Sequence, residues 1–237
     1  MLISKVKVDK KQYGLSSCKA DIYACLVQVD ASDSIASIIE EITDHSWIRR
    51  LNIVPKISYQ ARLKETVESI MKDCRIFISN QPVYDYSTVG EYIVSKEGRR
   101  TLYDHFSHLA VPLAELWKEK KSGNPGFDYH SEAPTNLIIF GEAKYKAQQN
   151  PYSIAIDQVE DFISREKDAR ELIDLENFVS PSAVQNFVDG KKGFSIAFSI
   201  HAKNPQMILN NAIRYVNANQ IANYNEYYIV GVLINDK

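Results

Sequence analysis

The sequence predicts an α/β fold, in an α+β arrangement with helices flanking a mixed β-sheet. Two observations carry this prediction. A continuously apolar run at residues 136–140 (NLIIF) has the length and composition of a strand that is buried on both faces. After it, helix-like and strand-like patterns alternate as far as residue 234, as expected for a sheet covered by helices. A chain of 237 residues can bury a full core, in one large domain or two small ones.

The N-terminal part of the chain mixes both kinds of element. Residues 21–30 (DIYACLVQVD) have the composition of a strand. Residues 34–43 place isoleucines three and four positions apart, which is typical of an amphipathic helix. A second helix is predicted for residues 59–72, followed by a short apolar segment at residues 75–79.

A turn-rich stretch at residues 80–86 marks the candidate boundary between two parts of the chain. We expect an N-terminal α/β segment, residues 1–85, packed on a core of residues 86–237. Within this core, Pro112 should bend or divide the longest predicted helix. The helices expected in the core are residues 88–95, 99–121, 152–165, 168–178, 182–188 and 205–222. The strands expected there are residues 136–140, 194–201 and 227–234.

Composition excludes several classes of protein. Apolar residues make up 45% and charged residues 24%, which disfavours a disordered chain, a collagen and a coiled coil. The formal net charge of −2 gives no general attraction to polyanions. Three cysteines without a C-x-x-C pair fit neither a disulfide framework nor a zinc site, so a reducing cytoplasm is the expected location. No stretch approaches the ~18 apolar residues of a membrane span, so no membrane partner is expected.

The candidate active site lies at the end of the apolar run. Glu142 and Lys144 are two positions apart, so the alternation of side chains along a strand places both on one face. Asp128 can reach the same point from an adjacent strand or its end. Two carboxylates and a lysine match the needs of metal-assisted phosphodiester cleavage. Hard oxygen ligands hold Mg²⁺, and a lysine polarises or helps to deprotonate the attacking water.

This pattern resembles the PD-(D/E)xK nuclease superfamily. In that superfamily an acidic residue is followed later in the chain by an E-x-K motif, which lies at the end of a hydrophobic strand. The resemblance implies a restriction-endonuclease-like core, metal binding by Asp128 and Glu142, and a catalytic role for all three residues, with Lys144 serving the water. Phe127 stands where the motif carries a proline. That proline is commonly absent from members of the superfamily, so the departure changes little.

Two further residues are candidates for the same site. Gln158, with Phe162 one turn later, resembles the Q-x-x-x-Y element of RecB-like members, which implies a supporting catalytic role for Gln158. Glu115 is preferred to Glu119 as a third metal-binding carboxylate, because many members place a helical acid near the metal. The implied ion is Mg²⁺, and Mn²⁺ is expected to substitute for it.

A longer resemblance is narrower. Residues 105–113 (HFSHLAVPL), 122–128 (SGNPGFD) and 140–145 (FGEAKY) are similar to the HamA family, the nuclease subunits of Hachiman antiphage defence. This implies a subunit that partners the superfamily 2 helicase HamB and degrades DNA when infection triggers the helicase. We expect the N-terminal segment and the surface around residues 105–113 to dock the helicase, which keeps the site inactive until DNA is unwound.

Three alternatives stay open. The chain can be a free-standing restriction-type endonuclease, acting as a dimer beside a companion methyltransferase. It can be a non-catalytic subunit that uses the same fold as a docking platform in a DNA-processing complex. Glu142 and Lys144 can also form a purely structural ion pair, since a D…E-x-K pattern arises easily in a chain with 30 acidic residues. Charges that interrupt a buried strand are costly unless they are satisfied or functional, which favours the nuclease interpretation.

Overall fold

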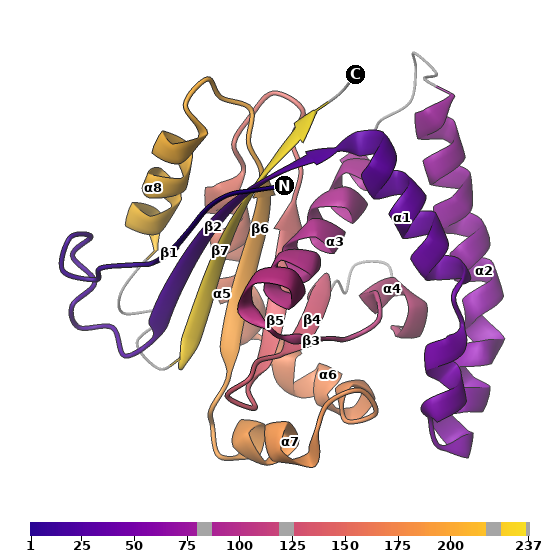
Figure 1. Cartoon of the computed structure of the whole chain (residues 1–237). Helices are drawn as coiled ribbons and strands as arrows, with labels where there is room; N and C mark the ends of the chain where they lie inside the picture. Colours follow the sequence, from indigo (N-terminus) through magenta and orange to yellow (C-terminus); the bar gives the residue numbers. More distant parts are fainter. Residues whose placement is uncertain (80–86, 119–125, 217–223, 236–237) are drawn as a thin grey trace.

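The computed structural model describes residues 1–79, 87–118, 126–216 and 224–235. Its described strands form one mixed sheet in the order β1-β2-β7-β6-β5-β4-β3 (Figure 1). Neighbours from β2 to β5 run parallel, whereas β1, β4 and β3 pair antiparallel. The strands are β1 (Leu2–Lys7), β2 (Asp21–Asp30), β3 (Leu109–Ala110), β4 (Tyr129–Glu132), β5 (Ile138–Lys144), β6 (Gly193–Ser199) and β7 (Glu226–Asn235).

Helices cover both faces of the sheet, which confirms the predicted α/β class (Figure 1). The helix α3 lies against one face, and α1 and α2 pack on its outer side. On the opposite face, α5 covers β5 and β6, and α8 covers β2 and β7. The described helices are α1 (Ala31–Thr43), the 3₁₀ helix η1 (Ser46–Arg50), α2 (Ile53–Ile78), α3 (Ser87–Phe106), α4 (Ala114–Trp117), α5 (Tyr152–Ser164), α6 (Lys167–Leu175), α7 (Pro181–Val188) and α8 (Pro205–Tyr215).

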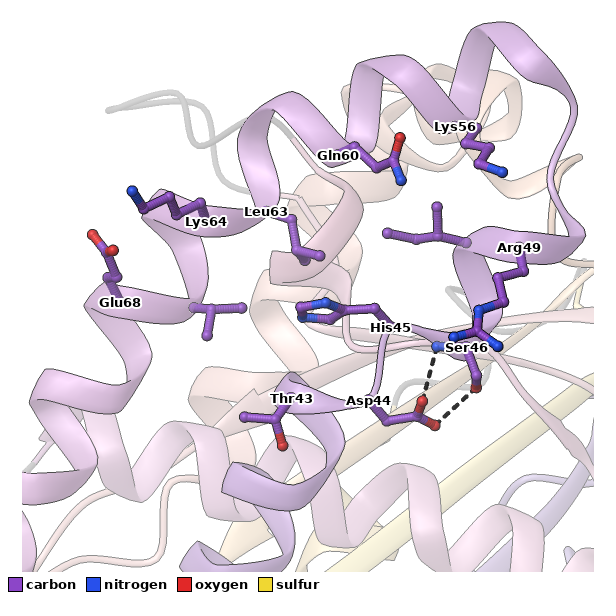
Figure 2. A pocket seen from close by; sticks show the side chains of 12 residues that line it. Thr43, Asp44, His45, Ser46, Arg49, Lys56, Gln60, Leu63, Lys64 and Glu68 are labelled. Carbon is purple, nitrogen blue, oxygen red and sulfur yellow. Dashed lines mark hydrogen bonds between the residues drawn. The ribbon is translucent and has the colours of Figure 1, made fainter.

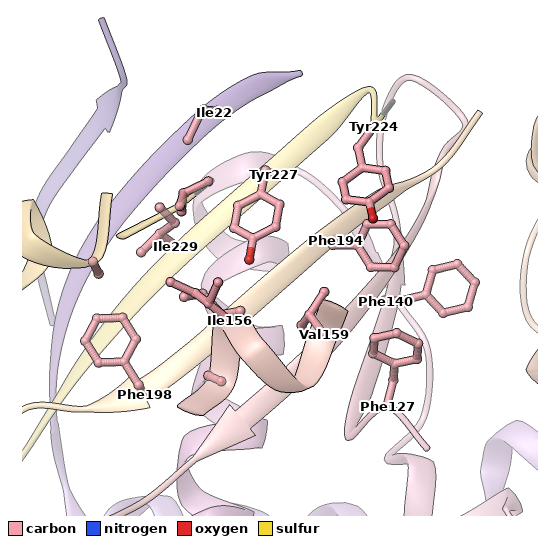
Figure 3. Packing of buried hydrophobic residues seen from close by; sticks show 14 of the residues in the cluster. Ile22, Phe127, Phe140, Ile156, Val159, Phe194, Phe198, Tyr224, Tyr227 and Ile229 are labelled. Atoms are coloured by element: carbon pink, nitrogen blue, oxygen red, sulfur yellow. The ribbon is translucent and has the colours of Figure 1, made fainter. Parts of the chain in front are cut away.

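Side-chain alternation along the strands places one apolar layer on each face of the sheet. In β6, Phe194 and Phe198 belong to the layer beneath α5 and α8, whereas Ala197 belongs to the layer beneath α3. Figure 3 shows the first layer, in which the aromatic rings of Phe127, Phe140 and Phe194 lie close together. Residues 138–143 of β5 are all buried, which confirms the prediction of a strand covered on both faces.

The N-terminal segment contributes directly to the sheet. β2 pairs in parallel with β7 along its whole length, from Asp21 opposite Glu226 to Asp30 opposite Asn235. β1 then extends the sheet by pairing with β2, although no strand was predicted at residues 2–7. Its side chains are mostly exposed at this edge of the sheet, so the sequence carries no buried periodicity there.

The predicted helix at residues 99–121 is wrong in its bounds. A single helix, α3, runs through Gly98 and ends at Phe106, where Ser107 adopts a positive φ of 60°. The chain then forms β3, and the short α4 begins only after Pro112. Gly98 does not divide α3. Instead, it permits close packing of the helix on the sheet, since an added Cβ would lie 2.7 Å from the Cβ of Ala197.

The helix predicted at residues 59–72 is also longer than expected. α2 is continuous from Ile53 to Ile78, so the short apolar segment predicted at residues 75–79 is mainly its last turn. No helix breaker lies between these segments. Parts of the prediction fall outside the described residues: the boundary at residues 80–86, Glu119 with the tract that follows it to residue 125, and residues 217–222 of the last predicted helix.

Buried polar contacts fix α1 and the chain before α4 against α3. Ser34 of α1 donates a hydrogen bond to Glu97 Oε1 at 2.9 Å. Arg99 donates to the carboxylate of Glu41 on α1 and, at 2.5 Å, to the carbonyl oxygen of Val111. Charge-assisted hydrogen bonds in such a buried setting are directional. They therefore fix the segment that leads into α4, which carries Glu115.

Candidate active site

The pairing of β4 with β5 brings two acidic residues face to face. Tyr129 pairs with Gly141, so Asp128, one residue earlier, comes opposite Glu142. The backbone N–H of Asp128 donates to the carbonyl of Gly141 at 2.8 Å. Its carboxylate accepts a hydrogen bond from the N–H of Ala143 at 2.7 Å. Asp128 is therefore held to β5 through both its main chain and its side chain.

Lys144 completes this group from the same strand. Its Nζ donates to Glu142 Oε1 at 2.6 Å and lies 3.9 Å from Glu91 Oε1 on α3. The side chain of Glu142 is fully buried, and that of Lys144 is 13% exposed. The structure thus brings together Asp128, Glu142 and Lys144, the three residues at the centre of the predicted site.

The electrostatics of the two acids are strongly coupled. Burial raises the pKa of Glu142 well above its ordinary value, and the charge of Asp128 raises it further, against the opposing effect of Lys144. Burial also raises the pKa of Asp128, although Lys144 and the N–H of Ala143 partly offset this. The close approach of the two carboxyl groups also lowers the pKa of Asp128 and raises that of Glu142. Of the two acids, Glu142 is therefore the one whose protonated form is more strongly favoured.

The donor set fits Mg²⁺. The second carboxyl oxygen of Glu142, Oε2, is buried and has no hydrogen-bond partner within the described structure. A buried oxygen of this kind is stabilised by a cation. Mg²⁺ needs one or two protein carboxylates, because water and phosphate oxygens fill the rest of its shell. Among the described residues, no group of three or more His, Cys, Asp or Glu side chains is arranged to hold a metal ion. Asp128 and Glu142 would hold it as a pair.

Glu115 lies on α4, near enough to Asp128 for their charges to interact. Burial raises its pKa to about 7, and the charge of Asp128 adds to the effect, whereas Lys118 lowers it. Asp128 and Glu115 therefore interact electrostatically. The role of Glu115 as a third metal ligand stays a prediction.

Gln158 lies on α5, and among the described residues no hydrogen bond joins it to Asp128 or Glu142. It lines a cavity of about 400 Å³ together with Asp161, Phe162 and Lys167, and neither Asp128 nor Glu142 lines that cavity. The catalytic role implied by the Q-x-x-x-Y resemblance stays a prediction.

Sequence reasoning did not identify a second polar cluster beside Asp128. Glu171 of α6 accepts hydrogen bonds from Lys118 Nζ at 2.5 Å and from the N–H of Phe127 at 3.0 Å. Its other oxygen lies 2.7 Å from His130 Nε2. Both Lys118 and Glu171 lie on predicted helices without any motif. The signal in the sequence was Phe127 itself, whose backbone N–H a proline would lack.

A cavity of about 900 Å³ lies elsewhere in the fold, between the end of α1, η1 and α2 (Figure 2). Arg49, Lys56 and Lys64 are among the side chains that line it. At its edge, the backbone N–H and hydroxyl of Ser46 donate to Asp44 at 2.8 and 2.9 Å (Figure 2). None of the predicted site residues lines this cavity.

No family model, curated protein or solved structure matches the chain. None of the described helices has the length and hydropathy needed to cross a membrane. All three cysteines are buried, and none of them forms a disulfide.

The raised pKa of Glu142 predicts a specific dependence of stability on pH. The folded chain binds the Glu142 proton more tightly than the unfolded chain does, so this group's stabilising contribution falls as pH rises above its unfolded pKa. His108 and His130 act in the opposite direction, because burial lowers the pKa of each to about 4. We therefore expect the Tm of Glu142→Gln, relative to wild type, to increase with pH above about pH 5.

Thermal unfolding in EDTA measures this difference directly. Both chains keep the two histidines, so the histidine contributions cancel when the two curves are subtracted. A difference in Tm that stays constant with pH would contradict the assignment of a raised pKa to Glu142.

Proposed function

We propose that this chain is a metal-dependent DNA nuclease, and that it acts as the effector subunit of a helicase–nuclease complex in antiphage defence. The observation that carries the nuclease assignment is the convergence of Asp128, Glu142 and Lys144 at the end of β5. The partner and the biological role rest on the resemblance to HamA, including the helicase HamB as the expected partner.

In this proposal, Asp128 and Glu142 hold Mg²⁺. When bound, the ion polarises the phosphoryl group and lowers the pKa of the attacking water. Binding requires an ionised Glu142 carboxylate, and because the pKa of Glu142 is raised, the affinity for metal depends on pH. The N–H of Ala143 fixes the Asp128 carboxylate in its place on the sheet.

Lys144 acts as a cation in this mechanism. Burial favours its neutral form, but the carboxylates of Glu142 and Asp128 outweigh burial and raise its pKa. Lys144 therefore stays protonated near neutral pH. It can orient the attacking water and stabilise negative charge on the phosphate, which favours electrostatic assistance over deprotonation of the water by Lys144.

Dependence on a partner is consistent with the charge of the chain. A net charge of −2 gives no general attraction to DNA, whose affinity for proteins depends largely on phosphate neutralisation. A helicase subunit would deliver DNA strands to the site.

Plasmid degradation tests the proposal. We expect the purified chain, combined with a helicase encoded beside it and ATP, to degrade DNA in Mg²⁺ but not in EDTA. The double variant Glu142→Ala/Lys144→Ala should leave the plasmid intact. Degradation by the chain alone, with no effect of the helicase, would favour a restriction-type endonuclease. Survival of the plasmid in every condition, or equal cleavage by the variant, would overturn the nuclease assignment in favour of a docking subunit.

A further inference from the structure

The residue before Asp128 is Phe127, so the main chain there lacks the constraint that a proline would impose. Proline fixes φ near −65° and has no N–H. The N–H of Phe127 instead donates to Glu171 Oε1 at 3.0 Å. The position before the catalytic acid is thus held by a hydrogen bond that a proline could not form.

Further bonds extend this contact to both sides of Asp128. Lys118 donates to Glu171 Oε1 at 2.5 Å and also to the carbonyl oxygen of Phe127. His130, two residues after Asp128 along the chain, contacts Glu171 Oε2 at 2.7 Å. The Glu171 carboxylate on α6 therefore contacts the residue before Asp128 and also His130, which lies on β4 after Asp128.

The charges in this cluster strengthen the contacts. Burial would raise the pKa of Glu171, but the charge of Lys118 and the hydrogen bonds from Lys118 and His130 outweigh burial and lower it. Glu171 therefore stays ionised near neutral pH. Its side chain is only 11% exposed, and that of Lys118 is 18% exposed. Charge-assisted hydrogen bonds shielded from water are short and strong.

Gly126 permits the close approach of Glu171 to the main chain. A Cβ at this position would lie 2.0 Å from Glu171 Oε1 and 3.0 Å from Lys118 Nζ. Any larger residue would displace the carboxylate from the N–H of Phe127. The sequence Gly126-Phe127-Asp128 is thus matched to an acidic residue on a distant helix.

We propose that Glu171 is the positioning residue that keeps Asp128 opposite Glu142, in place of the proline of the nuclease motif. This inference rests on the proposed function, because its consequence is the strength of metal binding at Asp128 and Glu142. Residues that orient metal ligands commonly change metal affinity by about 10- to 100-fold when they are substituted.

Mn²⁺ binding to the full chain, measured by titration calorimetry, tests this role without any need for cleavage. Glu171→Gln should weaken Mn²⁺ binding by about 10- to 100-fold. Glu176→Gln is the matched control, since Glu176 is exposed at the end of the same helix and should leave the affinity unchanged. Circular dichroism at the titration temperature would establish that each variant is folded.

Gly126→Ala provides a second variant that removes no charge. The atoms it would displace are the ends of flexible side chains, so we expect the protein to fold and to lose Mn²⁺ affinity in the same direction. Wild-type affinity in Gly126→Ala, or in a folded Glu171→Gln, would overturn the inference and leave the nuclease assignment standing. A wild-type chain that binds no Mn²⁺ would overturn both together.

Discussion

The substitution Glu142→Gln is expected to lower DNA cleavage by roughly 10³-fold while the protein stays folded. Glu142→Gln keeps the size of the side chain and one oxygen near Lys144 Nζ, which now lies 2.6 Å from Glu142 Oε1. It removes the negative charge that would hold the metal ion. Because Glu142 is buried and its pKa is raised, an ionised carboxylate at this position is itself costly.

Supercoiled plasmid cleavage in Mg²⁺, under the conditions that activate the wild type, measures this effect. Glu176→Gln is a suitable control, because Glu176 is exposed and lies outside the surfaces that we expect to dock the helicase. The catalytic assignment fails if Glu142→Gln cleaves at the wild-type rate. A loss of cleavage accompanied by unfolding would leave stability as the cause, so Tm is recorded for the same samples.

Phe127→Ala should cost about 3–5 kcal/mol in the free energy of unfolding. The Phe127 ring is buried, and its centroid lies 5.3 Å from that of Phe140, 5.2 Å from that of Phe162 and 5.8 Å from that of Phe194. Truncation leaves a cavity among aromatic rings that are anchored on several elements (Figure 3). The same change loosens the residue before Asp128.

Urea unfolding of purified variants measures this loss of stability. Tyr103→Ala is the matched control, since Tyr103 is an aromatic residue on α3 with 56% exposure and should change stability by less than about 0.5 kcal/mol. Phe127→Leu should fall between the two. A cost for Phe127→Ala no greater than that for Tyr103→Ala would show that this aromatic cluster does not stabilise the fold.

The centre of the candidate site was predictable because it depends on strand geometry alone. Two positions along a strand return a side chain to the same face, so Glu142 and Lys144 had to be neighbours once β5 was recognised. β5 was visible because burial on both faces leaves a continuous apolar run. The place of Asp128 followed less directly, since β4 (YHSE) has no apolar alternation and is held by its neighbours.

Tertiary contacts explain what the sequence could not predict. The end of α3 depends on the left-handed conformation of Ser107. Helices that end in this way usually carry glycine or asparagine at that position, so the serine gave no signal of the helix end. Glu171 lies more than forty residues from Phe127, and its three partners come together only through the packing of α6 against the site. Contacts between residues so far apart in the sequence cannot be predicted from local sequence patterns.

The parallel pairing of β2 with β7 has a consequence for the order in which the protein folds during translation. β2 must wait for a strand roughly 200 residues further along the chain, which a ribosome reaches after roughly 10–40 s. Until then, one long edge of an apolar strand lacks its neighbour and invites pairing with other nascent chains. β4, β5 and β6 emerge earlier, so Asp128 and Glu142 can come together before β7 joins β2 to β6. We expect chaperone dependence during synthesis to be relieved when β7 emerges.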